Sequence, residues 1–334
     1  MAAVLHEPDL LWLALGASRA IILTVQERFG SVTSHSDSAP VPTATFRRCF
    51  LEVIKPVQSG KVKVDGVDLY YELYGQGDPL VLVAGTGISL APWRVSQVPE
   101  FARHYQVLIY DHRGLGRSDK PDMHYTTRLF AKDCVGLMDA LGIQRAHMIG
   151  HSMGARVCQW IALDYPEKVR SLVLSGPGSG KYSDKLEDYP RGVPLDAALE
   201  MIEKGYEKYQ SDHWGPGFMF SESFVKDHPE IVKKYQELIV EEVPPLKCYL
   251  RHVVARQCHE TTHLIHQIKA PTLVIVGDKD THEGGTGSHV ESAKVLAENI
   301  PNAELVLIKD GRHGYLREMP EKGHPPILDF LRRH

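Results

Sequence analysis

The segment Gly150-His151-Ser152-Met153-Gly154 constrains the fold more than any other part of the chain. An apolar run at 146–149 precedes it, and 155–163 has the composition of a helix. This setting predicts a sharp strand-to-helix turn with the serine hydroxyl exposed at its tip. Glycine on either side of the turn removes side chains that would collide with the neighbouring strand and helix. Backbone N–H groups at the start of such a helix favour negative charge near the serine.

From residue 61 onward, strand-like and helix-like runs alternate. Such alternation predicts an α/β fold with a mostly parallel sheet covered by helices on both faces. An Asp-Gly turn at 65–66 predicts a hairpin at its start. The other strands are expected at 79–84, 107–110, 146–149, 169–174, 272–276 and 304–308, and the helices at 95–104, 126–141, 155–163, 290–300 and 316–332.

The alternation stops between residues 176 and 268, where helix-like segments at 194–209, 229–240 and 246–265 occur without a convincing strand. We expect this block to be a helical cap inserted over the carboxyl ends of the strands, where ligands bind in open α/β sheets. Residues 58–175 and 269–334 would then form one core. Residues 1–57 show no clear pattern after Val25, and we expect a flexible extension with no part in the fold.

Composition narrows the partners and the compartment. The formal net charge of −4 gives no reason to expect a nucleic acid or a membrane as partner. Five cysteines, an odd number without a C-x-x-C pair, indicate a reducing compartment and hence a cytoplasmic location. The apolar stretch 10–25 contains Arg19 and follows Glu7 and Asp9, unlike a typical secretory signal, although a cleaved signal or anchor stays open as an alternative. Oligomeric state cannot be deduced from these features.

A serine hydroxyl becomes a nucleophile only beside a base that an acid orients. His313 follows the last predicted strand and lies between two glycines, and we predict that it is the general base. Asp280, which follows the strand at 272–276, is the predicted acid. Asp278 is the alternative, and either carboxylate could instead cap the turn.

Two backbone N–H groups should stabilise the oxyanion that forms when the serine attacks. One belongs to Met153, directly after the serine, and the other to Thr86 in the Gly-Thr-Gly loop after strand 79–84. Aromatic and methionine side chains near this loop and in the cap would line an apolar substrate pocket or, as an alternative, pack internally. The pocket candidates are Gly85, Trp93, His151, Trp214, Phe218 and Met219.

These residues together resemble the α/β-hydrolase family over about residues 61–175 and 270–332. Residues 111–118 are similar to the family's D-x-R-G-x-G-x-S loop, and the Glu-Met-Pro-Glu run at 318–321 is similar to its ending. The resemblance implies a serine triad of Ser152, Asp280 and His313, and it identifies the helical block as the family's cap. One departure is Ala84-Gly85, where members commonly have His-Gly.

The nucleophile then narrows the expected reaction. Family members that act on haloalkanes or epoxides use an aspartate at the turn, whereas serine here favours acyl transfer to water without a cofactor. We therefore expect a carboxylic-ester hydrolase acting on small or medium esters or lactones, similar to enol-lactonases and small carboxylesterases. Cleavage of a C–C bond or peroxide chemistry by the same triad stays open, as does a non-catalytic hydrolase-like binding protein.

A second motif, His-Glu-Thr-Thr-His at 259–263, matches H-E-x-x-H. On a helix this spacing would place both imidazoles on one face for zinc, with Glu260 as base. A third ligand would be needed, and His266 is too near on the same helix to be singled out. We therefore expect a solvated or packed helix there, and no metal.

Overall fold

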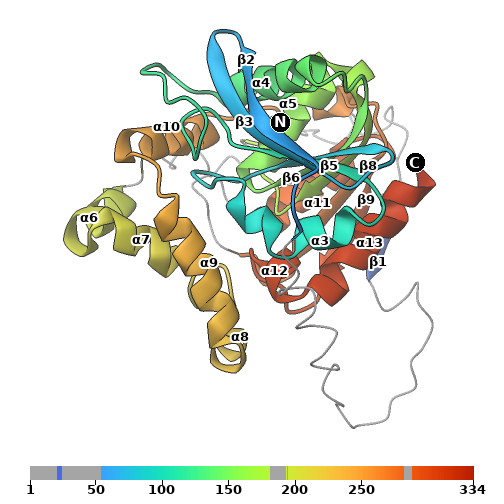
Figure 1. Ribbon diagram of the computed structural model, residues 1–334. Coiled ribbons are helices and arrows are strands. Elements are labelled where there is room, and N and C mark those ends of the chain that lie inside the picture. Colours follow the sequence, from blue (N-terminus) through green and yellow to red (C-terminus); the bar gives the residue numbers. More distant parts are fainter. Residues whose placement is uncertain (1–20, 25–53, 181–192, 194, 282–287) are drawn as a thin grey trace, which may run out of the picture.

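The centre of the molecule is a nine-stranded, mostly parallel sheet, seen in the computed structural model, which describes residues 21–24, 54–180, 193, 195–281 and 288–334 (Figure 1). The strand order is β1-β9-β8-β7-β6-β4-β5-β3-β2. Only β3 pairs antiparallel, with β2 and with β5. The strands are β1 (Ile21–Thr24), β2 (Gln58–Val64), β3 (Val67–Tyr74), β4 (Pro79–Val83), β5 (Gln106–Tyr110), β6 (Ala146–His151), β7 (Val169–Ser175), β8 (Thr272–Gly277) and β9 (Glu304–Ile308).

Helices cover both faces of this sheet, so the predicted α/β class is confirmed (Figure 1). Those of the core are α3 (Gln97–Phe101), α4 (Thr127–Ala140), α5 (Met153–Asp164), α11 (His289–Asn299), α12 (Tyr315–Glu318) and α13 (Pro320–Arg333). Single 3-10 turns are η1 (Ala91–Arg94), η2 (Pro166–Lys168) and η4 (Ile265–Gln267). The helix predicted over 316–332 is interrupted at Met319, and α13 begins with Pro320 at its first position.

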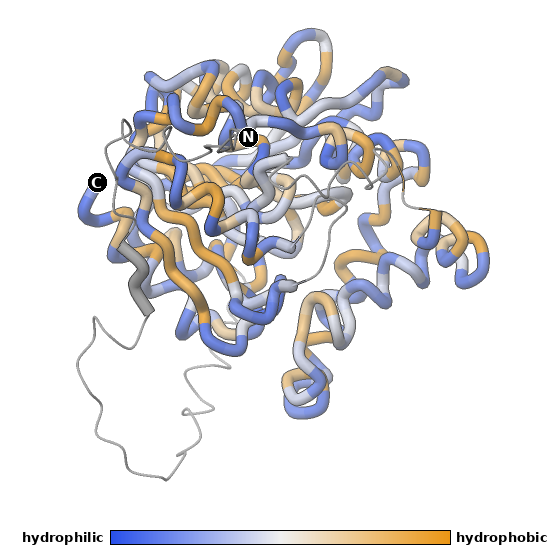
Figure 2. The backbone as a smooth tube through the Cα atoms, turned by 180° about the vertical axis from the view of Figure 1, so that it is seen from behind, coloured by the Kyte–Doolittle hydropathy of each residue, from blue (hydrophilic) through white to orange (hydrophobic). Residues whose placement is uncertain are grey.

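Successive side chains of the central strands enter two different hydrophobic cores, because side chains alternate between the faces of a strand. Val81 and Val83 of β4 belong to the core under α4, α5 and α11. Leu80 and Leu82 belong to the core under α3, α12 and α13. A strand buried on both faces needs an unbroken apolar sequence, and hydrophobic stretches accordingly run through the sheet in Figure 2.

One edge of the sheet is formed by a strand from residues 1–57, the segment that we expected to take no part in the fold. β1 pairs parallel with β9, with Ile21 opposite Glu304 and Thr24 opposite Leu307. The edge of β9 presents backbone groups that a further strand can satisfy, and the Ile-Ile-Leu-Thr sequence of β1 favours extended structure. Four residues upstream of the core therefore contribute to the sheet.

Between β7 and β8 the described chain forms five helices, and α6 to α9 stand to one side of the sheet in Figure 1. They are α6 (Leu195–Lys204), α7 (Tyr206–His213), α8 (Glu222–Asp227), α9 (Pro229–Glu241) and α10 (Leu246–Gln257). The helix expected over 194–209 is broken by Gly205, whose φ is +82°. α8 was not predicted, and α10 ends eight residues before the expected position. The division into core and cap stays a prediction, and we call residues 195–257 the cap helices.

None of the helices within the described ranges has the length and apolar character needed to cross a lipid bilayer.

Candidate active site

Ser152 occupies a strained turn between β6 and α5. Its φ of 58° and ψ of −120° lie outside the regions that residues with a Cβ normally adopt. The flanking glycines allow the close approach that this turn requires. A Cβ on Gly150 would lie 2.3 Å from the carbonyl oxygen of Gly154, and one on Gly154 would lie 2.0 Å from that of Val83. The strand-turn-helix geometry expected from the sequence is therefore present.

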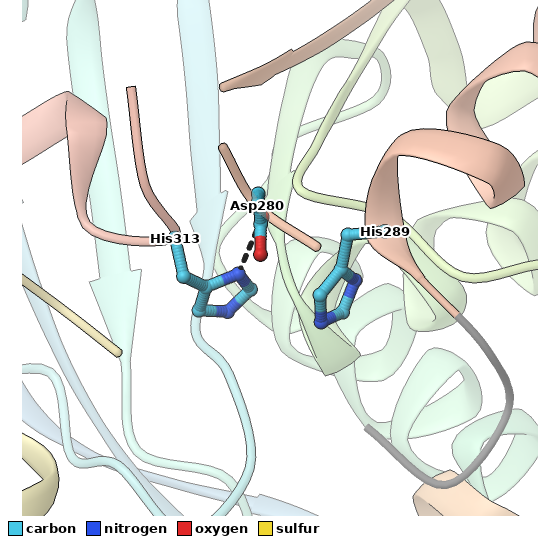
Figure 3. Close-up of side chains that lie close together, drawn as sticks. All are labelled: Asp280, His289 and His313. Carbon is cyan, nitrogen blue, oxygen red and sulfur yellow. Dashed lines mark hydrogen bonds and ion pairs between the residues drawn. The ribbon is translucent and has the colours of Figure 1, made fainter. Parts of the chain in front are cut away.

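His313 and Asp280 form a buried hydrogen-bonded pair beyond the carboxyl ends of β9 and β8. His313 Nδ1 lies 2.8 Å from Asp280 Oδ2, and the two residues are 3% and 1% exposed (Figure 3). Asp278 takes a different role, since its Oδ1 accepts the backbone N–H of Asp310 at 2.8 Å. With Nδ1 donating to Asp280, Nε2 of His313 is the nitrogen able to accept a proton. The structure thus brings Asp280, rather than Asp278, to the imidazole.

Three rings surround the imidazole of His313. Phe218 stacks on it with ring centroids 4.8 Å apart, His289 at 4.5 Å, and His151 lies tilted at 4.7 Å. His289 Nδ1 hydrogen-bonds the carbonyl of Pro177 at 2.9 Å. Burial lowers the pKa of His289 to about 3 and that of His151 well below its usual value, so both stay neutral at pH 7.

Ser152 and His313 line one cavity of about 380 Å³. Among the contacts of the described residues, no hydrogen bond joins the serine hydroxyl to the imidazole. Such bonds between nucleophile and base are often long without substrate and shorten when it binds. The nucleophile candidate and the base candidate therefore line the same cavity. The carboxylate of Asp280 hydrogen-bonds the imidazole of the base candidate.

The two predicted oxyanion donors lie close to Ser152. Thr86 lines the cavity, and a Cβ on neighbouring Gly85 would lie 3.3 Å from the Cβ of Ser152. Met153 is the first residue of α5. Within the described part of the chain, neither N–H takes part in the backbone hydrogen-bond pattern, so both are free to donate to a ligand.

Residues 111 and 112 support the loop that carries Thr86. Asp111 Oδ1 accepts the N–H of Leu90 at 2.8 Å, and its Oδ2 accepts that of Arg117 at 2.9 Å. Burial raises the pKa of Asp111 to about 6. Nε2 of His112 lies 3.3 Å from the carbonyl oxygen of Ala84. The imidazole of His112 therefore contacts the backbone of Ala84. This is the position at which members of the family that the sequence resembles commonly have a histidine.

Most of the predicted pocket residues line the cavity, and two do not. His151, Trp214, Phe218 and Met219 contribute to its wall, whereas Gly85 and Trp93 are not among its lining residues. Trp93 is 1% exposed and packs edge-on against His151, so the alternative of internal packing describes it. The sequence did not indicate several other lining residues, which come from the cap helices and α11: Met201, Tyr209, Gln210, Tyr249, Val253, Arg256 and His289.

The loop 217–221 of the cap region is bonded to the segment that carries His313. The N–H of Gly314 donates to the carbonyl of Met219 at 3.1 Å, and Nη1 of Arg312 donates to that of Gly217 at 2.7 Å. Glu318 accepts both the N–H and the hydroxyl of Ser221. These bonds hold Phe218 against the imidazole.

The H-E-x-x-H motif is not helical, because α10 ends before it. Both ring nitrogens of its first histidine, His259, hydrogen-bond threonine hydroxyls, Thr127 at 2.8 Å and Thr261 at 3.0 Å, and His263 is exposed. Elsewhere in the described ranges, Asp280, His289 and His313 are the one group whose potential metal-ligating atoms lie within 4.8 Å of one another. In both histidines of that group, Nδ1 already hydrogen-bonds a protein oxygen.

The fold is that of the α/β-hydrolases, and the family model for the alpha/beta hydrolase fold matches residues 78–316. The chain belongs to this family. A putative carbamate hydrolase RutD from Azorhizobium caulinodans is 26% identical over 79% of this chain and 94% of its own length. A 2-hydroxy-6-oxononadienedioate/2-hydroxy-6-oxononatrienedioate hydrolase from Burkholderia vietnamiensis is 30% identical over 80% and 93%. Among solved structures, the enol-lactonase of Burkholderia xenovorans superposes with a TM-score of 0.70 at 25% identity, covering 82% of this chain and all of that one.

Proposed function

We propose that the protein is a serine hydrolase of carboxylic esters, acting on small or medium esters or lactones through an acyl-enzyme. The observation that carries the proposal is the strained Ser152 at the head of α5, sharing a cavity with the buried His313–Asp280 pair. A cavity of about 380 Å³ suits a small substrate. The named activities of the relatives, on a carbamate, a dienedioate and an enol-lactone, agree with hydrolysis by a common site.

In the proposed reaction, Oγ of Ser152 attacks the carbonyl carbon while Nε2 of His313 takes the hydroxyl proton. The N–H groups of Thr86 and Met153 stabilise the oxyanion. His313 gives the proton to the leaving alkoxide, which departs as the alcohol and leaves an acyl-serine. Water then attacks the acyl carbon, its proton passes to His313 and on to Oγ, and the carboxylic acid is released. Asp280 holds the imidazole in the Nδ1–H tautomer and stabilises its cation.

The test is a panel of 4-nitrophenyl esters of increasing chain length, together with several lactones. The Ser152→Ala variant should lose turnover of all of them, and retention of its ester turnover would rule out the mechanism. Asp280→Asn should lower kcat by roughly 10³–10⁴-fold because the imidazole loses its orienting acceptor. Asp278→Asn is the matched control, since Asp278 contacts a loop N–H and not the imidazole.

Cleavage of a C–C bond is the second candidate, and the relative named as a dienedioate hydrolase favours it. The same serine, base and oxyanion donors would serve. Adding a 2-hydroxy-6-oxo-dienoate to the panel separates the two functions. A higher kcat/KM for this compound than for any ester or lactone would assign the protein to C–C bond hydrolysis.

A further inference from the structure

The wall of the cavity contains a cationic side chain that the proposed reaction does not use. Arg256, next to the last residue of α10, lines the cavity together with Ser152 and is partly exposed. Its carbonyl accepts a hydrogen bond of 3.3 Å from Nη1 of Arg156, which lies one helical turn after Ser152 on α5. The last turn of α10 is thereby fixed to the helix that begins at the nucleophile.

Arg256 has no acidic partner among the described residues. Two carboxylates line the same cavity, but Glu200 pairs with Lys204 at 2.8 Å and Asp196 is exposed. Burial lowers the pKa of Arg256, and the groups that oppose this shift are two phenols, Tyr249 and Tyr209. A guanidinium nevertheless remains charged at neutral pH. A partly desolvated cation without a counter-charge gains stabilisation from an anion that enters the cavity.

The surroundings of Arg256 suit a carboxylate that is part of a substrate. A planar guanidinium binds both oxygens of a carboxylate through parallel hydrogen bonds. Tyr249, beside Arg256, also lies against the loop at 85–87, which carries the proposed oxyanion donor Thr86. A Cβ on Gly87 of this loop would be 2.4 Å from the ring of Tyr249. Arg256, Ser152 and the proposed oxyanion donor Thr86 therefore line the same cavity of about 380 Å³, which a substrate carrying a carboxylate would share with them.

We propose that Arg256 binds a free carboxylate of the substrate, so that the preferred substrates are half-esters of short dicarboxylic acids or lactones that carry a carboxylate. This inference rests on the proposed function of the same site. It assigns Arg256 to substrate specificity and leaves bond cleavage to Ser152, His313 and Asp280.

The kinetic test compares the 4-nitrophenyl half-ester of glutaric acid with neutral 4-nitrophenyl pentanoate. We expect kcat/KM to favour the half-ester by about tenfold or more, as a hydrogen-bonded charge pair in a cavity would produce. Arg256→Met should remove this preference, because it lowers kcat/KM for the half-ester much more than for the pentanoate. Arg251→Met is the matched control, because Arg251 lies on the same helix but pairs with Asp122 outside the cavity.

A binding measurement separates this inference from the reaction. In the Ser152→Ala background, calorimetry should detect binding of glutarate, and adding Arg256→Met or Arg256→Gln should weaken it by about tenfold. Serine-dependent turnover of the pentanoate without a preference for the half-ester would overturn the inference and leave the ester hydrolase standing. If neither ester is hydrolysed, the proposed function fails, and glutarate affinity alone decides: affinity unchanged by both Arg256 substitutions refutes the anion site.

Discussion

The backbone conformation of Ser152 leads to a prediction about stability. At a φ of 58° and a ψ of −120°, a residue with a Cβ is strained by about 1–3 kcal/mol, whereas glycine adopts such angles readily. Ser152→Ala and Ser152→Gly both remove the hydroxyl, but only the glycine variant relieves the strain. Glycine normally costs about 0.5–1 kcal/mol through the entropy of the unfolded chain. The net expectation is that Ser152→Gly is more stable than Ser152→Ala by about 1 kcal/mol.

Thermal unfolding of the two variants measures this difference directly. A difference of about 1 kcal/mol corresponds to about 2–4 °C in Tm for a domain of this size. Ser223 provides the matched control, because it is exposed and lies in α8 with an ordinary negative φ. There the order should reverse, with the glycine variant less stable than the alanine variant. If Ser152→Gly unfolds at or below the Tm of Ser152→Ala, the turn stores no strain and the reasoning is refuted.

Three further predictions concern a close backbone contact, a buried ion pair and a buried carboxyl group. Gly154→Ala should destabilise by about 3 kcal/mol in urea denaturation, because its Cβ would collide with the backbone of Val83 and Ala84, while Gly60→Ala, whose Cβ has 3.9 Å of room, should be nearly neutral. Asp133→Ala should cost about 3–5 kcal/mol, because it leaves Arg113 buried without the carboxylate that it contacts at 2.5 and 2.6 Å. The double variant Arg113→Met/Asp133→Leu should recover most of that loss, and failure to recover it would contradict a cost due to the unpaired charge. The pKa of Asp111 rises from 3.8 to about 6 on folding, so its contribution to stability is present at low pH and is lost as pH rises through 6. Between pH 7 and pH 5 the protein should gain about 1 kcal/mol relative to Asp111→Asn, and equal pH dependence of the two would exclude this assignment.

The sequence predicted those parts of the site that depend on position along a strand. Ser152, Asp280 and His313 each follow the carboxyl end of a strand, and neighbouring parallel strands bring such positions to one edge of a sheet. Local patterns of apolar residues and glycines were sufficient for these predictions. They were also sufficient for the hairpin of β2 and β3, whose Asp-Gly turn pairs Val64 with Val67.

The part of the site supplied by the cap helices could not be predicted in this way. Arg256 and Tyr249 are seven residues apart on α10, so both lie on one face of the helix, but the spacing does not indicate that this face meets the cavity. Their orientation depends on how α10 docks against α5 and against the loop at 85–87, which is set by contacts distant in sequence. β1 was missed for a related reason, since a four-residue run becomes a strand only when the edge of β9 is present to pair with it.

The bonds between loop 217–221 and the segment after β9 have a consequence for how substrate enters. Displacing this loop would break its bonds to Arg312 and Gly314, which flank His313, and would remove Phe218 from the imidazole. In the proposed mechanism, an entrance on that side would therefore displace the groups that surround His313 at every turnover. We expect substrate to enter away from this loop, past α6, which contributes Met201 to the wall, because movement there leaves the bonds to Arg312 and Gly314 intact.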